Sequence, residues 1–364
     1  MIELIALVLV GVALLTDILL VIAWLVNFKS DVDELLEFPK VDILIAARDE
    51  EGTIGRCFDS LIALDYPKEK INIWVGDDDS SDKTWEVIES YQNKYPHIHG
   101  IKIKEKITAG NGKANVLAQL AHLGKAKWMF ITDADITVPN QWIKAMLGAA
   151  ISNELVLVTG TSLVEGNAFL ARFQRVEWLY ATSMLKVVSD MGVQATTMGN
   201  NMAIRRDAYE EVGGYENIPF SVTEDLELFK QVKKRHATRN LFSVEVLNKS
   251  VPQTRLMSLY IQRKRWMRGA FQLPFSMLFI LVVQAVFFPA VIGLIIINPI
   301  WGIALWMAKW FTKYVFMSLS ARKLKEKLSI FDSFVMDWVS IIFSMTSLVY
   351  YFWPGKIKWK GRTY

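Results

Sequence analysis

The stretch Trp128-Met129-Phe130-Ile131-Thr132-Asp133-Ala134-Asp135 is an apolar, strand-like run that ends in two carboxylates. Side chains two positions apart on an extended strand point the same way, so Asp133 and Asp135 are expected to face one point. Two acidic oxygen donors at the end of a buried strand suit a hard divalent cation such as Mg²⁺ or Mn²⁺. Because such a cation typically holds a diphosphate, the stretch predicts a site for a nucleotide diphosphate compound.

Strand and helix signals alternate around this stretch, from residue 40 to about residue 250. Further strands are predicted at 41–46, 71–75 and 101–103, and helices at 51–63, 83–91, 114–123 and from 141 onward. This order predicts an α/β fold with a mainly parallel sheet and helices on both faces. Ligands of such sheets bind at the carboxyl ends of the strands. Acidic residues fall at these ends, namely Asp49, Glu50, Asp77, Asp78, Asp133 and Asp135.

Charge and hydrophobicity are segregated along the 364-residue chain. Hydrophobic residues make up 52% of it and charged residues 21%; most of the charge lies between Asp31 and Arg268, and the apolar runs lie at the two ends. The formal net charge of +4 argues against nucleic acid as the main partner. A single cysteine, Cys57, excludes an intramolecular disulfide, and the four histidines have no zinc-ligand spacing.

The apolar runs predict membrane segments at both ends of the chain. Residues 2–26 are long enough to cross a bilayer, and without a preceding basic residue or a cleavage site they are predicted to be a retained anchor. Lys29 favours a cytosolic location for the residues after it. The predicted organisation is an anchor at 1–28, a catalytic domain at 40–250, an amphipathic interface helix at 251–270, a hairpin at 271–320 with a turn at Asn298-Pro299, a third segment at 330–354 and a basic tail at 355–364.

The predicted topology contains a conflict. If all four segments cross the membrane, the basic tail ends outside, whereas the positive-inside rule prefers it inside. One C-terminal segment is therefore a candidate for a re-entrant or interfacial position. Two segments fit this description. One is the partly polar segment 331–353, and the other is 273–288, the proline-containing half of the predicted hairpin.

Two acidic motifs follow the first two strands. In Ala46-Ala47-Arg48-Asp49-Glu50-Glu51, Glu50 could accept hydrogen bonds from ribose hydroxyls, although acids also favour the first turn of a helix. In the segment 76–84, a carboxylate such as Asp78 could accept the imide proton of a uracil ring. The alternative for this second segment is a turn with a helix cap, which Asp and Ser build routinely.

Two further motifs lie at predicted helix starts. In Gly110-Asn111-Gly112-Lys113 the glycines free the backbone, so the helix start and Lys113 could approach a phosphate, although an ordinary loop would look the same. In Thr223-Glu224-Asp225 a carboxylate beside a sugar donor could act as general base on an acceptor hydroxyl. The alternative is a threonine-capped helix with acids in its first turn.

The basic helix predicted at 255–269 contains Gln262-Arg263-Lys264-Arg265-Trp266. Its alternation of basic and apolar residues suits an anionic membrane surface. Gln262, Arg265 and Trp266 share one helix face, because positions i, i+3 and i+4 are neighbours. Trp266 offers a flat wall for a sugar ring, and the other two offer donors for a departing diphosphate. A plain juxtamembrane helix explains the remaining cations but does not require Gln262.

The ordered set of motifs resembles the membrane-integrated inverting glycosyltransferases of family 2, which include cellulose, chitin and hyaluronan synthases and the ceramide glucosyltransferases. The resemblance covers about residues 40–269 and extends to the flanking membrane segments. It rests on the motifs at Asp77-Asp78, 133–135, 199–207 with 213–215, 223–225 and 262–266, and on a similar closing segment at 359–364.

The resemblance implies a GT-A type domain with a mixed, mainly parallel sheet. It further implies that Asp78 binds uracil, that Asp135 together with Asp133 holds a divalent metal, and that Asp225 is the base beside Glu224. The remaining donor-binding residues implied are Ala46, Arg48, Glu50, Asp77, Asp78, Lys113 and Asp133, and those at the acceptor and diphosphate are Gly199, Asn200, Gln262, Arg265 and Trp266. Ala46 stands where proline is common and Asp49 where asparagine is common, so the first motif departs from the usual pattern.

The small membrane part favours a lipid hexosyltransferase, which moves a sugar from a UDP-sugar to a lipid hydroxyl at the cytosolic face of the inner membrane. Processive polysaccharide synthases must also thread a polymer through the bilayer, and they usually carry more spans. Such a synthase is the alternative within the same class. A non-catalytic scaffold that binds nucleotide sugars is the alternative of another class, and the complete set of acids at Asp133, Asp135 and Asp225 argues against it.

Overall fold

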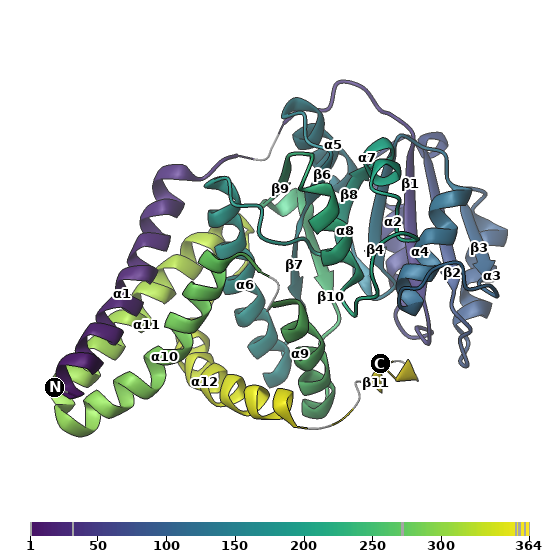
Figure 1. The fold of residues 1–364 in the computed structure, drawn as a ribbon. Helices are drawn as coiled ribbons and strands as arrows, with labels where there is room; N and C mark the ends of the chain where they lie inside the picture. Colours follow the sequence, from purple (N-terminus) through teal and green to yellow (C-terminus); the bar gives the residue numbers. More distant parts are fainter. Residues whose placement is uncertain are drawn as a thin grey trace.

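The computed structural model describes residues 2–30, 33–270, 273–353, 355, 358–359 and 362–363. Its catalytic part is built on a seven-stranded sheet in the order β3-β2-β1-β4-β8-β6-β9 (Figure 1). The strands are β1 (Val41–Ala47), β2 (Ile71–Asp77), β3 (Ile98–Lys102), β4 (Trp128–Asp133), β6 (Leu157–Thr159), β8 (Asn201–Arg205) and β9 (Thr238–Asn240). The first four strands pair in parallel, and β8 runs antiparallel to β4 and β6. The predicted mixed, mainly parallel sheet is confirmed.

Helices cover both faces of this sheet. Successive side chains of β1 point to opposite faces and pack against different helices. Ile43 and Ile45 pack with α2 (Ile54–Ile62) and α5 (Trp142–Ser152), whereas Leu44 packs with α4 (Gly112–Leu123) on the opposite face. All three side chains are buried, as expected for a parallel strand covered on two sides. The first face also carries α3 (Thr84–Lys94), and the second carries α7 (Arg206–Glu211) and α8 (Glu224–Val232).

Some observed bounds differ from the predicted ones. α2 begins at Ile54 rather than at residue 51, because the Glu50 carbonyl first accepts the N–H groups of Thr53 and Ile54 in a turn. β3 begins at Ile98 rather than at residue 101, because it pairs with β2 from Ile98 opposite Ile73 onward. Pairing with a neighbouring strand therefore sets the strand's length here, which a short apolar run does not reveal.

The helix α6 (Phe169–Asp190) was not predicted, although it has 22 residues. Its buried side chains include Phe173, Val176, Leu179 and Val187, which recur at helical spacing. The helical spacing of apolar residues was present in the sequence, but polar residues interrupt it. α6 packs against α1, α11 and α12 and joins the catalytic part to the membrane helices (Figure 1).

A small sheet in the order β5-β10-β7 lies beside the main one. It contains β5 (Ile136–Thr137), β7 (Thr161–Val164) and β10 (Leu247–Ser250). β5 follows the Asp133–Asp135 segment directly, and the last residue of β10, Ser250, donates a hydrogen bond to Asp135 Oδ2 at 3.3 Å. The small sheet therefore helps to fix the end of β4.

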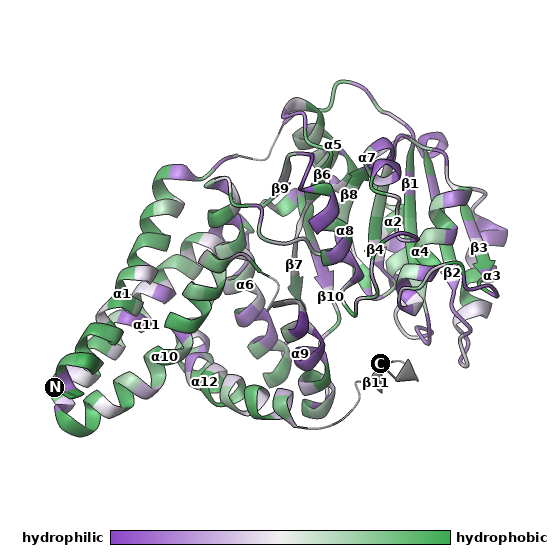
Figure 2. Cartoon of the chain, in the orientation of Figure 1, coloured by the Kyte–Doolittle hydropathy of each residue, from purple (hydrophilic) through white to green (hydrophobic). Residues whose placement is uncertain are grey.

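Four long helices form the apolar part: α1 (Ile2–Asn27), α10 (Phe275–Ile297), α11 (Pro299–Lys323) and α12 (Ile330–Phe352). Of the described residues, three segments are long and apolar enough to cross a membrane, and they lie in α1, α10 and α12. α11 is as long but carries Lys309 and Lys313. α1 packs along α10 and α11 (Figure 1), and Figure 2 shows all four helices as largely hydrophobic. α10 ends and α11 begins at Asn298, where a turn was predicted, and the Asn298 side chain caps α11.

Half of the predicted basic tail, and half of the closing 359–364 motif, lies outside the described residues. The described part pairs as β11 (Lys358–Trp359) and β12 (Arg362–Thr363).

Asp42 is a fully buried carboxylate in β1 that joins several elements. Its Oδ1 accepts hydrogen bonds from Asn72 Nδ2 and Trp74 Nε1, and its Oδ2 accepts one from the Ala126 N–H. Oδ2 also pairs with Arg206 Nη2 at 3.0 Å. The charge in β1 is thus compensated by groups from β2, from the loop before β4 and from α7.

Replacing Asp42 by Ala is expected to lower the free energy of unfolding by about 3–5 kcal/mol, because it leaves the Arg206 charge without its buried partner. Chemical denaturation in detergent, followed by tryptophan fluorescence, measures this. Asp65→Ala is the matched control, because Asp65 pairs with Lys144 at the surface, where an ion pair contributes at most about 1 kcal/mol. Equal effects of the two substitutions would contradict a structural role for the buried pair.

Candidate functional site

One cavity of about 890 Å³ lies at the carboxyl ends of β1, β2 and β4 and extends between α6 and α9 (Leu256–Ala270) to α10, α11 and α12. The predicted site residues that line it are Ala46, Arg48, Glu50, Asp78, Lys113, Asp133, Asp135, Gly199, Asn200, Glu224, Asp225, Gln262, Arg265 and Trp266. The structure therefore brings these separated motifs to one space. Asp77 is the exception among the predicted residues, since it does not line the cavity.

The loops after β1 and β2 are joined by hydrogen bonds. Arg48 Nη1 donates to the Asp78 carbonyl, and the Asp78 N–H donates to the Ala47 carbonyl. Asp49 Oδ1 accepts the Ser81 N–H at 2.8 Å, and Asp49 has a φ of 52°, in the left-handed region that Asp tolerates. These contacts fix the two loops as one wall of the cavity.

Asp77 and Asp78 point to different surroundings although they are neighbours. Asp77 ends β2 and accepts a hydrogen bond from Ser80 Oγ, so it stabilises the turn. Asp78 is buried and lines the cavity. Both residues were predicted to bind the donor, and of the two only Asp78 lines the cavity.

Lys113 bridges two of the acidic motifs at the start of α4. Its Nζ lies 2.5 Å from Asp133 Oδ1 and 3.5 Å from Glu224 Oε1, and its side chain is only 14% exposed. Burial alone would lower the pKa of Lys113, but the charges of Asp133, Glu224 and Asp225 outweigh it and raise that pKa. Lys113 is therefore a fixed cation between the end of β4 and the start of α8.

Asn111 is a positioning residue that sequence reasoning missed. It caps α4, since its Oδ1 accepts the Ala114 N–H at 2.8 Å. Its Nδ2 donates to Glu224 Oε2 at 2.7 Å and to the Ser221 carbonyl at 2.9 Å. The cap signal of an Asn before a helix was readable, but the link to Glu224, more than a hundred residues away, arises only from the fold.

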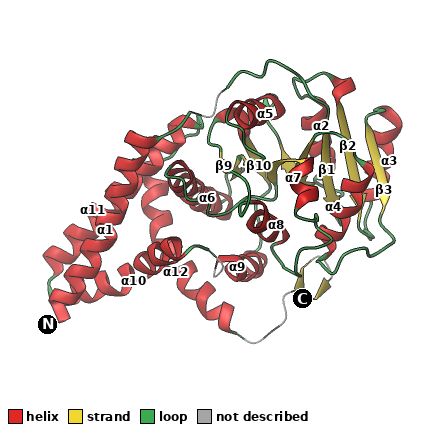
Figure 3. Cartoon of the chain, turned by 45° about the horizontal axis from the view of Figure 1, so that its top comes forward, coloured by secondary structure: helices red, strands yellow, loops and turns green. Residues whose placement is uncertain are grey.

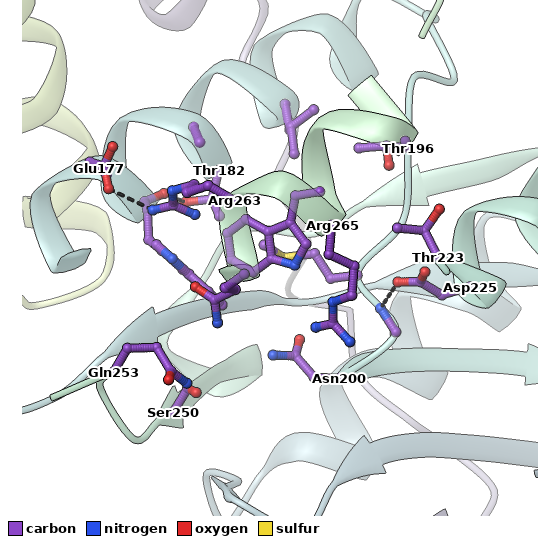
Figure 4. A pocket seen from close by; sticks show the side chains of 18 of the residues that line it. Glu177, Thr182, Thr196, Asn200, Thr223, Asp225, Ser250, Gln253, Arg263 and Arg265 are labelled. Atoms are coloured by element: carbon purple, nitrogen blue, oxygen red, sulfur yellow. Dashed lines mark hydrogen bonds and ion pairs between the residues drawn. The ribbon is translucent and has the colours of Figure 1, made fainter. Parts of the chain in front are cut away.

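Asp225 lies in the first turn of α8 with both carboxylate oxygens held by backbone N–H groups. Oδ2 accepts the Gly199 N–H at 2.8 Å, which Figure 4 draws as the dashed line at Asp225. Oδ1 accepts the Leu226 N–H at 2.9 Å. Each oxygen keeps a second lone pair for a ligand. Burial and the neighbouring charge of Glu224 raise the pKa of Asp225, while Lys113 counteracts them. An oriented carboxylate with a raised pKa in a cavity fits a general base.

The helix α9 presents its predicted face to the cavity, and Figure 3 shows it lying between α8 and α12. Gln262, Arg265 and Trp266 line the cavity, and Figure 4 shows Arg265 pointing toward Asn200. Trp266 packs on Trp178 of α6 with ring centroids 5.5 Å apart. The side-chain oxygen of Gln262 is buried and has no hydrogen-bond partner within the described part of the chain, so it is left for a ligand.

The prediction that the cations of this helix lie on a membrane surface is wrong for Arg263 and Lys264. Arg263 pairs with Glu177 of α6 at 2.5 Å and stacks over the Trp266 ring at 4.5 Å. Lys264 is buried and donates to the Trp353 carbonyl at 2.7 Å. The sequence could not reveal this, because the partner helices α6 and α12 are distant in the chain. These cations hold α9 in place.

A family model described as glycosyl transferase family 21 matches residues 4–364 of the chain. The chain belongs to this family. The match covers the apolar helices as well as the catalytic part, so the relationship predicted from the ordered motifs is confirmed.

Curated relatives of this family member include glycolipid and polysaccharide enzymes. The chain is 25% identical over 241 residues to beta-monoglucosyldiacylglycerol synthase of Synechocystis sp., covering 65% of this chain and 48% of that protein. It is 29% identical over 245 residues to the probable glycosyltransferase YdaM of Bacillus subtilis (65% and 56%). It is 24% identical over 239 residues to poly-beta-1,6-N-acetyl-D-glucosamine synthase of Staphylococcus epidermidis (63% and 54%). The chain thus spans about half the length of the curated relatives it matches.

Among solved structures, the chain is similar to the mannosyltransferase PcManGT from Pyrobaculum calidifontis in complex with GDP-Man and Mn²⁺. The TM-score is 0.63 at 17% identity, covering 97% of this chain and 99% of that one. At this identity the likeness concerns the fold alone. It confirms the predicted GT-A type fold with flanking apolar helices.

Asp133 and Asp135, the predicted cation ligands, lie at the end of β4. Asp133 pairs with Lys113, and Asp135 accepts the hydrogen bond from Ser250. Among the residues that the structure describes, no group of three or more His, Cys, Asp or Glu side chains gathers as a metal site. Two carboxylates are compatible with Mg²⁺ or Mn²⁺, because Mg²⁺ in particular often takes its other ligands from substrate phosphates and water.

Replacing Gly199 by Ala is expected to lower the turnover number for glycosyl transfer roughly 10- to 100-fold while nucleotide binding is kept. An added Cβ would lie 2.7 Å from Cβ and Oδ2 of Asp225 and displace that carboxylate, and such displacements cost rate steeply. Steady-state rates and nucleotide titration measure the two effects. Gly55→Ala is the control, because its Cβ would meet only an ordinary contact at 3.7 Å. Unchanged turnover in Gly199→Ala would contradict the tight fit.

Proposed function

We propose that this protein is a membrane-bound inverting hexosyltransferase that moves a sugar from a UDP-sugar to the hydroxyl of a lipid. The single observation that carries the proposal is that one cavity joins the acidic motifs at the sheet to apolar side chains of α10 and α11. A water-soluble donor and a membrane-dissolved acceptor could meet only in such a space. The relatives that act on diacylglycerol support a lipid acceptor.

The proposed location is the cytosolic face of the cell membrane, with the protein anchored by several helices. The candidate spans in α1, α10 and α12 support the anchoring. Nucleotide sugars are cytosolic metabolites, and Lys29 at the end of α1 favours the cytosol for the catalytic part.

The donor is proposed to bind along the carboxyl ends of β1, β2 and β4. Asp78 is proposed to accept the uracil imide proton, and Arg48 and Glu50 to line the ribose region. Asp135 and Asp133 would hold a divalent cation, Mg²⁺ or Mn²⁺, which when bound would neutralise charge on the diphosphate. Lys113 is oriented beside Asp133 and would add positive charge near the phosphates.

The chemistry is proposed to be a single displacement. Asp225 takes the proton of the acceptor hydroxyl at a carboxylate oxygen while the acceptor oxygen attacks the anomeric carbon from the face opposite the diphosphate. The bond to the diphosphate breaks as the new bond forms, so the configuration inverts. Arg265 donates to the departing diphosphate, and Trp266 packs on the acceptor side. Gly199 and Asn111 position Asp225 and Glu224 for these roles.

The decisive experiment incubates the purified full chain in lipid vesicles with Mn²⁺ and each of a panel of UDP- and GDP-sugars. The expected product is an organic-soluble glycolipid of one added hexose, identified by mass, with UDP released and the anomeric configuration inverted by NMR. A water-insoluble polymer would instead establish the polysaccharide synthase, which the Staphylococcus epidermidis relative represents. Nucleotide-sugar binding without any release of nucleotide would establish a non-catalytic scaffold.

Replacing Lys113 by Met is expected to move the acidic limb of the turnover–pH profile to higher pH. Asp225 is a base only when ionised, so activity is present above its pKa and is lost as the pH falls through it. Lys113 lowers the pKa of Asp225, so its removal raises that pKa further. Lys104→Met, at an exposed position, is the control. An acidic limb that stays in place would show that another group controls it.

A further inference from the structure

The membrane end of the cavity is lined by polar groups rather than by hydrocarbon alone. Lys309 Nζ pairs with Asp17 Oδ2 of α1 at 2.5 Å and donates to Gln284 Oε1 of α10 at 2.7 Å. Lys313 Nζ pairs with Asp337 Oδ1 of α12 at 2.8 Å. Both lysines belong to α11. Polar residues among apolar helices are costly and usually mark a functional site.

The charges at this end are balanced in pairs. Lys309 and Asp17 compensate each other, as do Lys313 and Asp337. The Arg263–Glu177 pair beside them is balanced too. A lipid with a phosphate headgroup would have to displace a carboxylate or leave uncompensated negative charge in an apolar environment. The pairing therefore favours an uncharged ligand.

Hydrogen-bond donors without acceptors are also present here. Trp306 and Trp310 line the cavity one helical turn apart on α11, and they are only 8% and 9% exposed. Their indole Nε1 atoms have no acceptor among residues 2–30, 33–270 and 273–353 or the described tail positions. A buried N–H group without an acceptor costs free energy, so these two positions suit a ligand that carries acceptor oxygens.

The membrane end lies close to the proposed acceptor face of α9. On α6, Glu177 pairs with Arg263 of α9, and three positions later Tyr180 donates to Asp17 Oδ1 at 3.3 Å. Lys313 Nζ lies 4.9 Å from the centre of the Tyr180 ring. Side chains three positions apart on a helix are about 5–6 Å apart at Cβ. The Arg263–Glu177 pair and the polar residues around Tyr180 are thus separated by one turn of α6.

We propose that this end of the cavity binds the acyl carbonyl oxygens of an uncharged acceptor lipid, through Nε1 of Trp306, Nε1 of Trp310 and the ammonium group of Lys313. Ester and amide carbonyls are uncharged acceptors that lie a few bonds from the lipid's free hydroxyl. They match a donor-rich, charge-balanced site that begins at Lys313, about one turn of α6 from the α9 face, and continues along α11 to Trp310 and Trp306. The inference rests on the proposed function and narrows its acceptor to an acylated lipid alcohol.

The test compares two acceptors that differ only in these oxygens: a 1,2-diacylglycerol and its 1,2-dialkyl ether analogue, in otherwise identical neutral vesicles. The wild type is expected to show a KM roughly tenfold higher for the ether analogue, since each hydrogen bond contributes a factor of a few. The double variant Trp306→Phe/Trp310→Phe is expected to raise the KM for the diacyl lipid and to leave that for the ether lipid unchanged. The KM for a ceramide, measured in the same vesicles, distinguishes binding of an amide carbonyl from binding of ester carbonyls.

Trp301→Phe is the matched control, because Trp301 lies on the same helix, is 58% exposed and does not line the cavity. Equal KM values for diacyl and dialkyl lipids in a wild type that makes glycolipid would overturn the inference and leave the proposed function intact. Transfer to a polyprenyl phosphate in preference to both would overturn the uncharged acceptor. A polymer product would overturn the proposed function itself.

Discussion

Replacing Asp225 by Asn is expected to abolish sugar transfer while leaving UDP binding largely intact. The amide cannot take a proton, and a positioned general base contributes roughly 10²- to 10⁴-fold in rate. Asn keeps an oxygen that can accept one of the N–H groups now held by the carboxylate, those of Gly199 and Leu226, so the local fold is preserved. Product formation from a radiolabelled UDP-sugar and calorimetric titration with UDP measure the two properties.

Glu227→Gln is the matched control for this variant. Glu227 is a buried acid two positions along α8, but it pairs with Lys230 and does not line the cavity. Its substitution is expected to change turnover by less than about threefold. Near-normal turnover in Asp225→Asn would remove Asp225 from the role of base. Loss of UDP binding together with transfer would indicate that the substitution disturbs the fold.

The first half of the sheet could be predicted because its signals are local. β1 and β4 are largely apolar runs, with Asp42 as the charged residue inside β1, and each is followed by polar residues that suit a strand end. The parallel order of strands then brings Asp78 and Asp135 to one edge, which needs no knowledge of side-chain packing. The position of Asp225 followed from a cap-like motif combined with the family resemblance.

The polar supports of the site could not be predicted, since their partners are far apart in the chain. In the sequence, Asn111 is only one residue of a loop motif. Its hydrogen bond to Glu224 forms because the fold brings the two residues together. Arg263 looked like a surface cation, yet it pairs with Glu177 on a helix that was not predicted. A basic residue on an amphipathic pattern has the same sequence signature whether it meets water or a buried carboxylate.

The number of spans at the C-terminal end conflicts with the positive-inside rule for the basic tail. The helix α11 shows why the spans are difficult to count. It has the length of a spanning helix, but Lys309 and Lys313 keep it from meeting the hydropathy expected of one. The ion pairs with α1 and α12 lower the cost of these charges. A hydropathy pattern treats each helix alone, whereas the helices here share their polar groups. The count of spans therefore depends on packing and not on composition alone.

Replacing Asp135 by Asn is expected to lower activity roughly 10²- to 10³-fold and to weaken the response to Mn²⁺. A bound cation supplies several kcal/mol of charge stabilisation to a departing diphosphate, and among the described residues this site offers few protein ligands for one. Activity measured across a Mn²⁺ titration, before and after EDTA treatment, tests this. The wild type should lose activity in EDTA and regain it with Mn²⁺, whereas the variant should need a higher Mn²⁺ concentration.

Asp65→Asn, the substitution of a surface carboxylate, is the control and should behave as the wild type. Transfer that survives EDTA in the wild type would show that Asp133 and Asp135 act without a metal, as direct polar contacts to the donor.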